Sequence, residues 1–152
     1  MSQNHPNKVV VHRRIAATRE ELFDAWIDPQ GMQEWMCPGD VISAEVQLEP
    51  RVGGNLFILM KGPTRTHEHT GQFRVFERPS KLAFTWTASN LEGQITIVTV
   101  EFHKVSNSET ELILTHESIP KKDVSDRYQS GWTKIVDLLE TYVQRHRGTR
   151  HA

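Results

Sequence analysis

Apolar residues follow two spacings along the chain, and the changes between them predict the order of helices and strands. Residues 9–15 are rich in valine and isoleucine and predict a short strand. Residues 22–36 then place apolar side chains three or four positions apart, which is the helical repeat. From Val41 the spacing becomes two, as expected for strands with one buried face. A final apolar stripe over residues 123–147 is helical again.

Two short helices are expected after the first strand. Thr18 and Glu21 fit a capping box, in which each side chain bonds the other residue's backbone and so starts a helix. Asp28-Pro29 should end this helix and begin the second one, because proline suits the first helical position. Pro38-Gly39 should end the second helix.

Six further strands and a long last helix complete the predicted order. The strands are expected at residues 41–48, 56–61, 69–77, 81–88, 94–105 and 111–118, with Ile42, Ala44, Val46 and Leu48 on one face of the first. Their short connections predict antiparallel hairpins. The helix should begin at Asp123 or Ser125 and end near Arg147, with Gly148 as its stop. This order indicates the α+β class, with one antiparallel sheet curved around the last helix and a ligand cavity between them.

Composition narrows the class of protein. The chain has 152 residues, which is enough for one domain, expected at residues 8–147 with loose ends at 1–7 and 148–152. A net charge of −1 provides no field to hold nucleic acid or an anionic membrane. The single cysteine, Cys37, excludes an internal disulfide. No apolar run approaches the roughly 20 residues of a membrane span, and residues 1–8 do not resemble a secretory signal. We therefore expect a soluble, cytoplasmic protein.

The candidate ligand-binding side chains are those expected to face the last helix or to lie on its apolar side. They are Trp35, Phe73, Phe84, Trp86, Val98, Val100, Leu114, His116, Trp132, Ile135, Val136 and Leu139. Val75 should extend the same inner surface beside Phe73. His116 is the polar member of its inward-facing set. It fits either a hydrogen-bonded core histidine or an anchor for a ligand headgroup, and its ordinary pKa of about 6.5 also suits acid–base chemistry.

Other polar features favour structural roles. His67-Glu68-His69 places two imidazoles on one side of a strand, but a metal site needs three or four ligands, so a solvated hairpin is expected. Cys37 has no catalytic base beside it in the sequence. Gly53-Gly54 suits a tight turn. No metal and no cofactor are predicted.

Several short segments, taken in order, resemble a known family. They are Ala25-Trp26, Trp35-Met36, residues 50–54, 82–86 and 112–117, and Gly131-Trp132. From residue 8 to residue 146 the chain resembles the AHSA-type branch of the START-like (SRPBCC) superfamily, whose members are similar to a domain of an activator of the heat-shock protein 90 ATPase. The resemblance implies a helix-grip fold, in which a curved antiparallel sheet grips the C-terminal helix over a deep, mostly apolar cavity.

The resemblance leaves function open, because the superfamily includes lipid carriers, hormone receptors, polyketide cyclases and co-chaperone domains. The residues favour a non-enzymatic module that binds a small hydrophobic molecule, which could carry one polar head. A first alternative is a cyclase- or hydrolase-like enzyme that uses His116, with Tyr128 as a second acid–base group. A second alternative is a co-chaperone-like module that binds a protein partner, which would show a large exposed apolar patch. Oligomeric state is left open.

Overall fold

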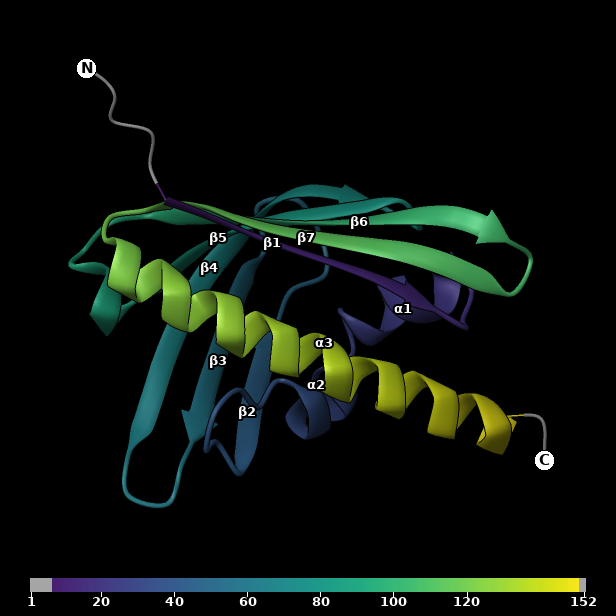
Figure 1. Cartoon of the computed structure of the whole chain (residues 1–152), viewed down its shortest axis with the longest axis horizontal. Helices are drawn as coiled ribbons and strands as arrows, with labels where there is room; N and C mark the ends of the chain where they lie inside the picture. The colour runs from purple at the N-terminus through teal and green to yellow at the C-terminus, as the bar shows by residue number, and fades with distance from the viewer. Residues whose placement is uncertain (1–6, 151–152) are drawn as a thin grey trace.

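A seven-stranded antiparallel sheet wraps around one long C-terminal helix (Figure 1). The structure is a computed structural model that describes residues 7–150, and the side chains of residues 7–146. The elements in chain order are β1 (Asn7–Ile15), α1 (Arg19–Ala25), α2 (Pro29–Trp35), β2 (Ser43–Leu48), β3 (Asn55–Lys61), β4 (Thr66–Glu77), β5 (Lys81–Ala88), the 3₁₀ turn η1 (Ser89–Leu91), β6 (Thr96–Ser106), β7 (Glu109–Ile119) and α3 (Lys122–Arg150).

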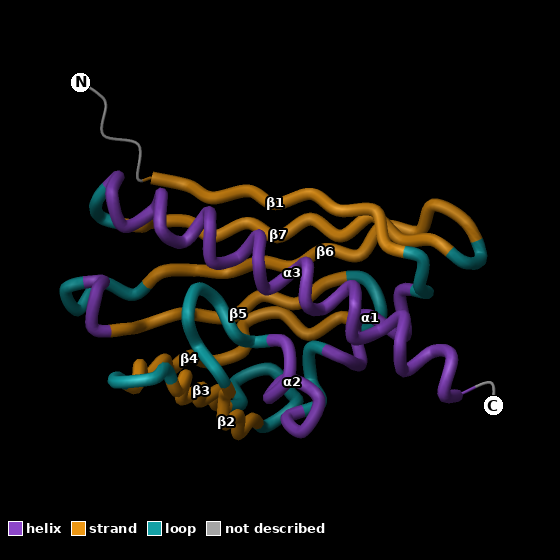
Figure 2. Tube along the Cα trace, turned by 60° about the horizontal axis from the view of Figure 1, so that its bottom comes forward, coloured by secondary structure: helices purple, strands orange, loops and turns teal. Residues whose placement is uncertain are grey.

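The strand order in the sheet is β1-β7-β6-β5-β4-β3-β2, with every neighbouring pair antiparallel. Strands β2 to β7 follow one another as hairpins, and β1 pairs with the last strand. Figure 2 shows α3 crossing one face of this curved sheet, while α1 and α2 lie toward one end of the same side. The α+β class and the helix-grip arrangement are therefore confirmed.

Both short helices begin at residues whose local sequence favours a helix start. The Thr18 hydroxyl accepts a hydrogen bond from the Glu21 backbone N–H at 3.1 Å, and the Glu21 carboxylate accepts one from the Thr18 N–H at 2.8 Å. This is the predicted capping box. α2 begins at Pro29 directly after Asp28, whose side chain makes no capping hydrogen bond.

Three local expectations are wrong. α3 does not stop at Gly148 but continues to Arg150, because a glycine within a long helix costs only about 1 kcal/mol. Ile42 precedes β2 and is 71% exposed, so it does not share the buried face of Ala44. A register shift between Phe73 and Val75 reverses the alternation in β4. As a result Phe76, rather than Val75, packs against Phe73, with ring centroids 5.5 Å apart.

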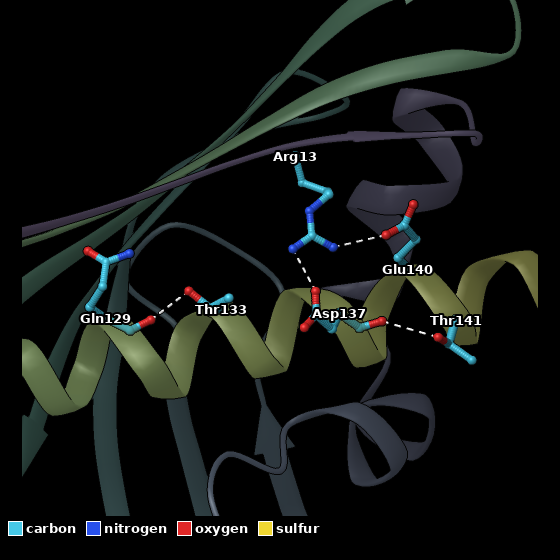
Figure 3. Close-up of polar contacts among 6 residues, drawn as sticks. All are labelled: Arg13, Gln129, Thr133, Asp137, Glu140 and Thr141. Carbon is cyan, nitrogen blue, oxygen red and sulfur yellow. Dashed lines mark hydrogen bonds and ion pairs between the residues drawn. The ribbon is translucent and has the colours of Figure 1, made fainter.

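Helix α3 is held by its buried face and by polar contacts with β1. Its buried side chains include Val124, Trp132, Ile135, Val136, Leu139 and Val143. Beside them, Arg13 of β1 forms ion pairs with Asp137 at 2.6 Å and Glu140 at 2.9 Å (Figure 3). The side chain of Gln129 donates to the Val10 carbonyl at 3.1 Å. These contacts hold α3 alongside β1.

Candidate functional site

A pocket of about 730 Å³ opens beside the first half of α3. Its walls come from the loop at residues 38–41, the β3–β4 hairpin, the junction of β5 with η1, and α3 itself. Gly131 allows α3 to approach the loop closely, because a Cβ added there would lie 3.3 Å from Cβ of Pro38. A volume of this size is typical of small-molecule sites.

The floor of the pocket is aromatic. Trp86 near the end of β5 and Trp132 of α3 both line it, and their ring centroids are 5.1 Å apart. Val41, Met60 and Ile135 add aliphatic surface. Both indoles are only 1% exposed, so they border the pocket while their rings pack against other aromatic side chains of the core.

Both indole N–H groups of the floor are already occupied by the protein. Nε1 of Trp86 donates to the Tyr128 hydroxyl at 3.2 Å, and that hydroxyl donates to the Asn90 side-chain oxygen at 3.0 Å. Nε1 of Trp132 donates to Nδ1 of His116 at 3.0 Å. The indole N–H groups of the floor are therefore not available to a ligand.

His116 lies behind this floor and does not line the pocket. Because its Nδ1 accepts from Trp132, the neutral ring carries its proton on Nε2 and donates to the Thr96 hydroxyl at 2.8 Å. That hydroxyl donates in turn to the Trp86 carbonyl at 2.7 Å. Burial, aided by nearby His69, lowers the pKa of His116 to about 3. Of its two sequence interpretations, the hydrogen-bonded core histidine fits this geometry.

His69 on β4 is the histidine that lines the pocket. It is only 8% exposed, and its ring lies 4.8 Å from the Trp86 ring. Its Nδ1 is enclosed and has no hydrogen-bond partner among the described residues. Burial, followed by the charge of His67, lowers the pKa of His69 to about 4, although the carbonyls of Ile58 and His67 partly oppose this shift. His69 is therefore neutral at pH 7.

The prediction of a solvated hairpin at His67-Glu68-His69 is wrong for one of its three residues. His67 and Glu68 are exposed, but His69 is buried beneath neighbouring elements of the pocket. A signal for this was present in the sequence, because alternation places His69 on the same face as Phe73, which was expected to point inward.

The predicted ligand-binding residues divide into two groups. Trp86, Trp132 and Ile135 line the pocket, and so does Tyr128. The others lie in the packed core away from it: Trp35, Phe73, Phe84, Val98, Val100, Leu114, His116, Val136 and Leu139. Aromatic rings fill much of the region between sheet and helix: Trp26 makes an edge-to-face contact with Trp35, with ring centroids 4.9 Å apart, and a tilted contact with Trp132 at 6.4 Å. The ligand-binding role of these residues stays a prediction.

Charged groups surround the mouth of the pocket. Arg65 of the β3–β4 connection and Arg127 and Lys134 of α3 line it, together with the acidic residues Asp40 and Glu68. Lys134 donates to the Gly39 carbonyl and so connects α3 to the loop. Arg127 lies 3.7 Å from Asp123.

Neither the cysteine nor a metal centre adds chemistry to this site. Cys37 is buried just before the pocket loop, and burial raises the pKa of its thiol, which disfavours the nucleophilic thiolate. Within the described part of the chain, no three His, Cys, Asp or Glu residues gather in a way that could hold a metal ion. No helix in that part is long and apolar enough to cross a membrane.

The curved sheet, the gripped helix and the pocket between them define a START-like helix-grip protein. Residues 16–144 match the model of the family described as Activator of Hsp90 ATPase homolog 1-like protein, and the chain belongs to that family. No curated protein matches the chain.

Solved structures agree with the fold. A protein from Chromobacterium violaceum is 20% identical with a TM-score of 0.82, and the match covers 90% of this chain and 96% of that one. A protein from Nitrosomonas europaea is 16% identical with a TM-score of 0.79, covering 93% and 96%. An HSP90 activator from Plasmodium falciparum is 25% identical with a TM-score of 0.69, covering 84% and 88%.

Proposed function

We propose that this protein binds a small hydrophobic molecule in the pocket beside the first half of α3. The observation that carries the proposal is the pocket of about 730 Å³ itself, whose walls include the apolar residues Val41, Met60, Trp86, Ala88, Trp132 and Ile135. Apolar walls favour a hydrophobic ligand, because binding removes apolar surface from water. The polar part of the ligand then lies toward the charged mouth.

The two alternatives draw less support from the same geometry. An acid–base role for His116 would require contact with a substrate, but this ring lies behind the floor with both nitrogens engaged. A protein-binding role would be supported by one large apolar patch. The exposed large apolar residues among those described come from different segments of the chain: Val10, Ile42, Val52, Ile95 and Val105.

Titration with N-phenyl-1-naphthylamine, a neutral fluorescent probe with flat rings, tests the proposal. We expect saturable binding of one probe per chain, with quenching of tryptophan fluorescence because Trp86 and Trp132 border the pocket.

Two phenylalanine variants locate the binding site. Ser130→Phe places a bulky ring on the pocket wall and should weaken binding at least tenfold. Gln144→Phe places the same ring on an exposed part of α3 away from the pocket and should leave binding unchanged. Absence of saturable binding, or equal effects of the two variants, would contradict the proposal.

A further inference from the structure

A chain of hydrogen bonds leads from the buried indole of Trp86 to the exposed wall of the pocket. Nε1 of Trp86 can only donate, and it donates to the Tyr128 hydroxyl at 3.2 Å. That hydroxyl gives its single proton to Oδ1 of Asn90 at 3.0 Å. The direction of the whole chain is therefore set by the indole at its buried end.

This chain orients the side chain of Asn90. The amide oxygen faces the Tyr128 hydroxyl, so the NH₂ group faces away from that residue. The amide nitrogen has no hydrogen-bond partner among the described residues. Asn90 lines the pocket and is exposed, so this donor is accessible to a ligand. The pocket wall thus presents an oriented hydrogen-bond donor that lacks an acceptor.

The turn that carries Asn90 is itself held in place. Leu91 is fully buried, and its carbonyl accepts a hydrogen bond from the Gln94 N–H at 2.8 Å. Glu92 forms an ion pair at 2.7 Å with Lys121, the residue before α3. A donor that is already positioned loses little conformational freedom when a ligand binds, so more of its hydrogen bond contributes to affinity.

The charges around the pocket are balanced and do not select a charged ligand. Histidines aside, the charged residues that line it are three basic and two acidic side chains: Arg65, Arg127, Lys134, Asp40 and Glu68. Arg127 also pairs with Asp123, which lies 3.7 Å away and supplies a third negative charge. With no excess of either sign, the pocket favours a polar group that is neutral.

We propose, as a refinement that rests on the proposed function, that the pocket selects a neutral hydrophobic molecule with a carbonyl group, and that Asn90 recognises the carbonyl oxygen. The amide N–H of Asn90 donates to that oxygen, while the apolar body of the ligand lies against the partly exposed Val41 and Ala88. Tyr128 is a positioning residue, because its hydroxyl orients Asn90. A ligand of the same shape without the oxygen leaves the donor unpaired.

Competition against N-phenyl-1-naphthylamine tests this preference with two ligands of the same shape. 2-Acetonaphthone carries a carbonyl group, and 2-isopropenylnaphthalene has a CH₂ group in place of the carbonyl oxygen. The quantity measured is the ratio of their dissociation constants, alkene over ketone. Because the two ligands also differ in hydration, the change of this ratio between variants isolates the contribution of the protein.

An asparagine pair assigns the preference to Asn90. Asn90→Asp keeps an oxygen for the Tyr128 hydroxyl but replaces the NH₂ donor by a second oxygen, and it should lower the ratio by about threefold or more. Asn107→Asp makes the same change in the β6–β7 turn, away from the pocket, and should retain the wild-type ratio.

A third variant tests the positioning role of Tyr128. Tyr128→Phe removes the hydroxyl that orients Asn90, and it should lower the ratio by about twofold or more. An unchanged ratio in folded Tyr128→Phe would overturn this role. The asparagine pair keeps the test of Asn90 decisive even if Tyr128→Phe fails to fold, because Asn90 is exposed on a turn.

Three results would overturn the refinement. The first is an unchanged ratio in Asn90→Asp, and the second is an equal fall of the ratio in Asn107→Asp. The third is tighter binding of 2-naphthoate than of 2-acetonaphthone to the wild-type protein, which would show selection of a charged group. Each of these leaves the proposed function intact, because the pocket still binds a probe. Failure of N-phenyl-1-naphthylamine and of both uncharged naphthalenes to bind would instead overturn the proposed function itself.

Discussion

At the scale of single residues, the two buried histidines differ in whether the protein completes their hydrogen bonds. His116 has partners for both ring nitrogens, Trp132 on one side and Thr96 on the other. His69 lines the pocket, and its enclosed Nδ1 has no hydrogen-bond partner among the residues that the structure describes. The first therefore belongs to the folding framework behind the floor, and the second borders the pocket.

Replacing His116 should destabilise the fold. His116→Leu leaves the Trp132 N–H buried without an acceptor, and we expect the free energy of unfolding at pH 7 to fall by about 1–3 kcal/mol. His103→Leu, on the exposed side of β6, should change it by less than about 0.5 kcal/mol. Urea unfolding followed by circular dichroism measures both, and equal stabilities would show that the His116 contacts contribute nothing.

At the scale of elements, α3 is the structural centre of the molecule because the whole sheet curves around its buried face. Its apolar stripe provides most of this contact. Arg13 of the edge strand β1 adds ion pairs to Asp137 and Glu140, which together form a polar clamp. The two contributions differ in their response to salt, so they can be separated by experiment.

Truncating the apolar stripe should be costly. Leu139 is fully buried, so Leu139→Ala should lower the free energy of unfolding by about 2–5 kcal/mol through lost burial and the remaining cavity. Gln144→Ala, on the exposed side of the same helix, is the matched control and should change it by less than about 0.5 kcal/mol. A chemical denaturation midpoint unchanged in Leu139→Ala would mean that the sheet does not grip α3.

Removing the polar clamp should have a smaller effect that depends on salt. Arg13→Met keeps most of the side-chain volume but loses both ion pairs, and we expect a loss of about 1 kcal/mol at low ionic strength. Screening at 1 M NaCl should reduce this difference, which thermal unfolding at the two salt concentrations would reveal. A salt-independent difference would assign the effect to packing of the arginine stem.

At the scale of the whole molecule, stability should fall in mild acid. The folded pKa values of His69 and His116 are about 4 and about 3, below the roughly 6.5 of an unfolded histidine. Between these values the unfolded chain binds more protons than the folded one, so stability is complete above about pH 6.5 and is lost as pH falls.

The expected loss between pH 7 and pH 5 is about 2–4 kcal/mol for the two histidines together. Urea unfolding at half-unit steps of pH would measure it. In His116→Leu the slope with pH should be about half that of wild type, because one of the two buried imidazoles is gone. A flat profile in wild type would show that these rings are charged in the folded protein or exposed to solvent.

Much of the fold was predictable because the signals are local. The capping box at Thr18 and the switch from a spacing of three or four to a spacing of two each depend on residues close together in the chain. The exceptions have local causes that a pattern of apolar residues does not reveal. The register shift after Phe73 exchanged Val75 for Phe76 in the core, and α3 continued through Gly148.

The sequence by itself determined the α+β class, the order of elements and the aromatic residues that would be buried, because hydrophobic periodicity and turn chemistry follow from neighbouring residues. Only the tertiary structure decided which buried residues meet the pocket. Trp132 is 46 positions from Trp86 along the chain, yet the two rings are neighbours in the floor of the pocket. The Trp132 N–H donates to His116, so this imidazole is not available to a ligand. His69 and His116 occupy equivalent inward positions on their strands, so their different roles arise from long-range packing that no local pattern encodes.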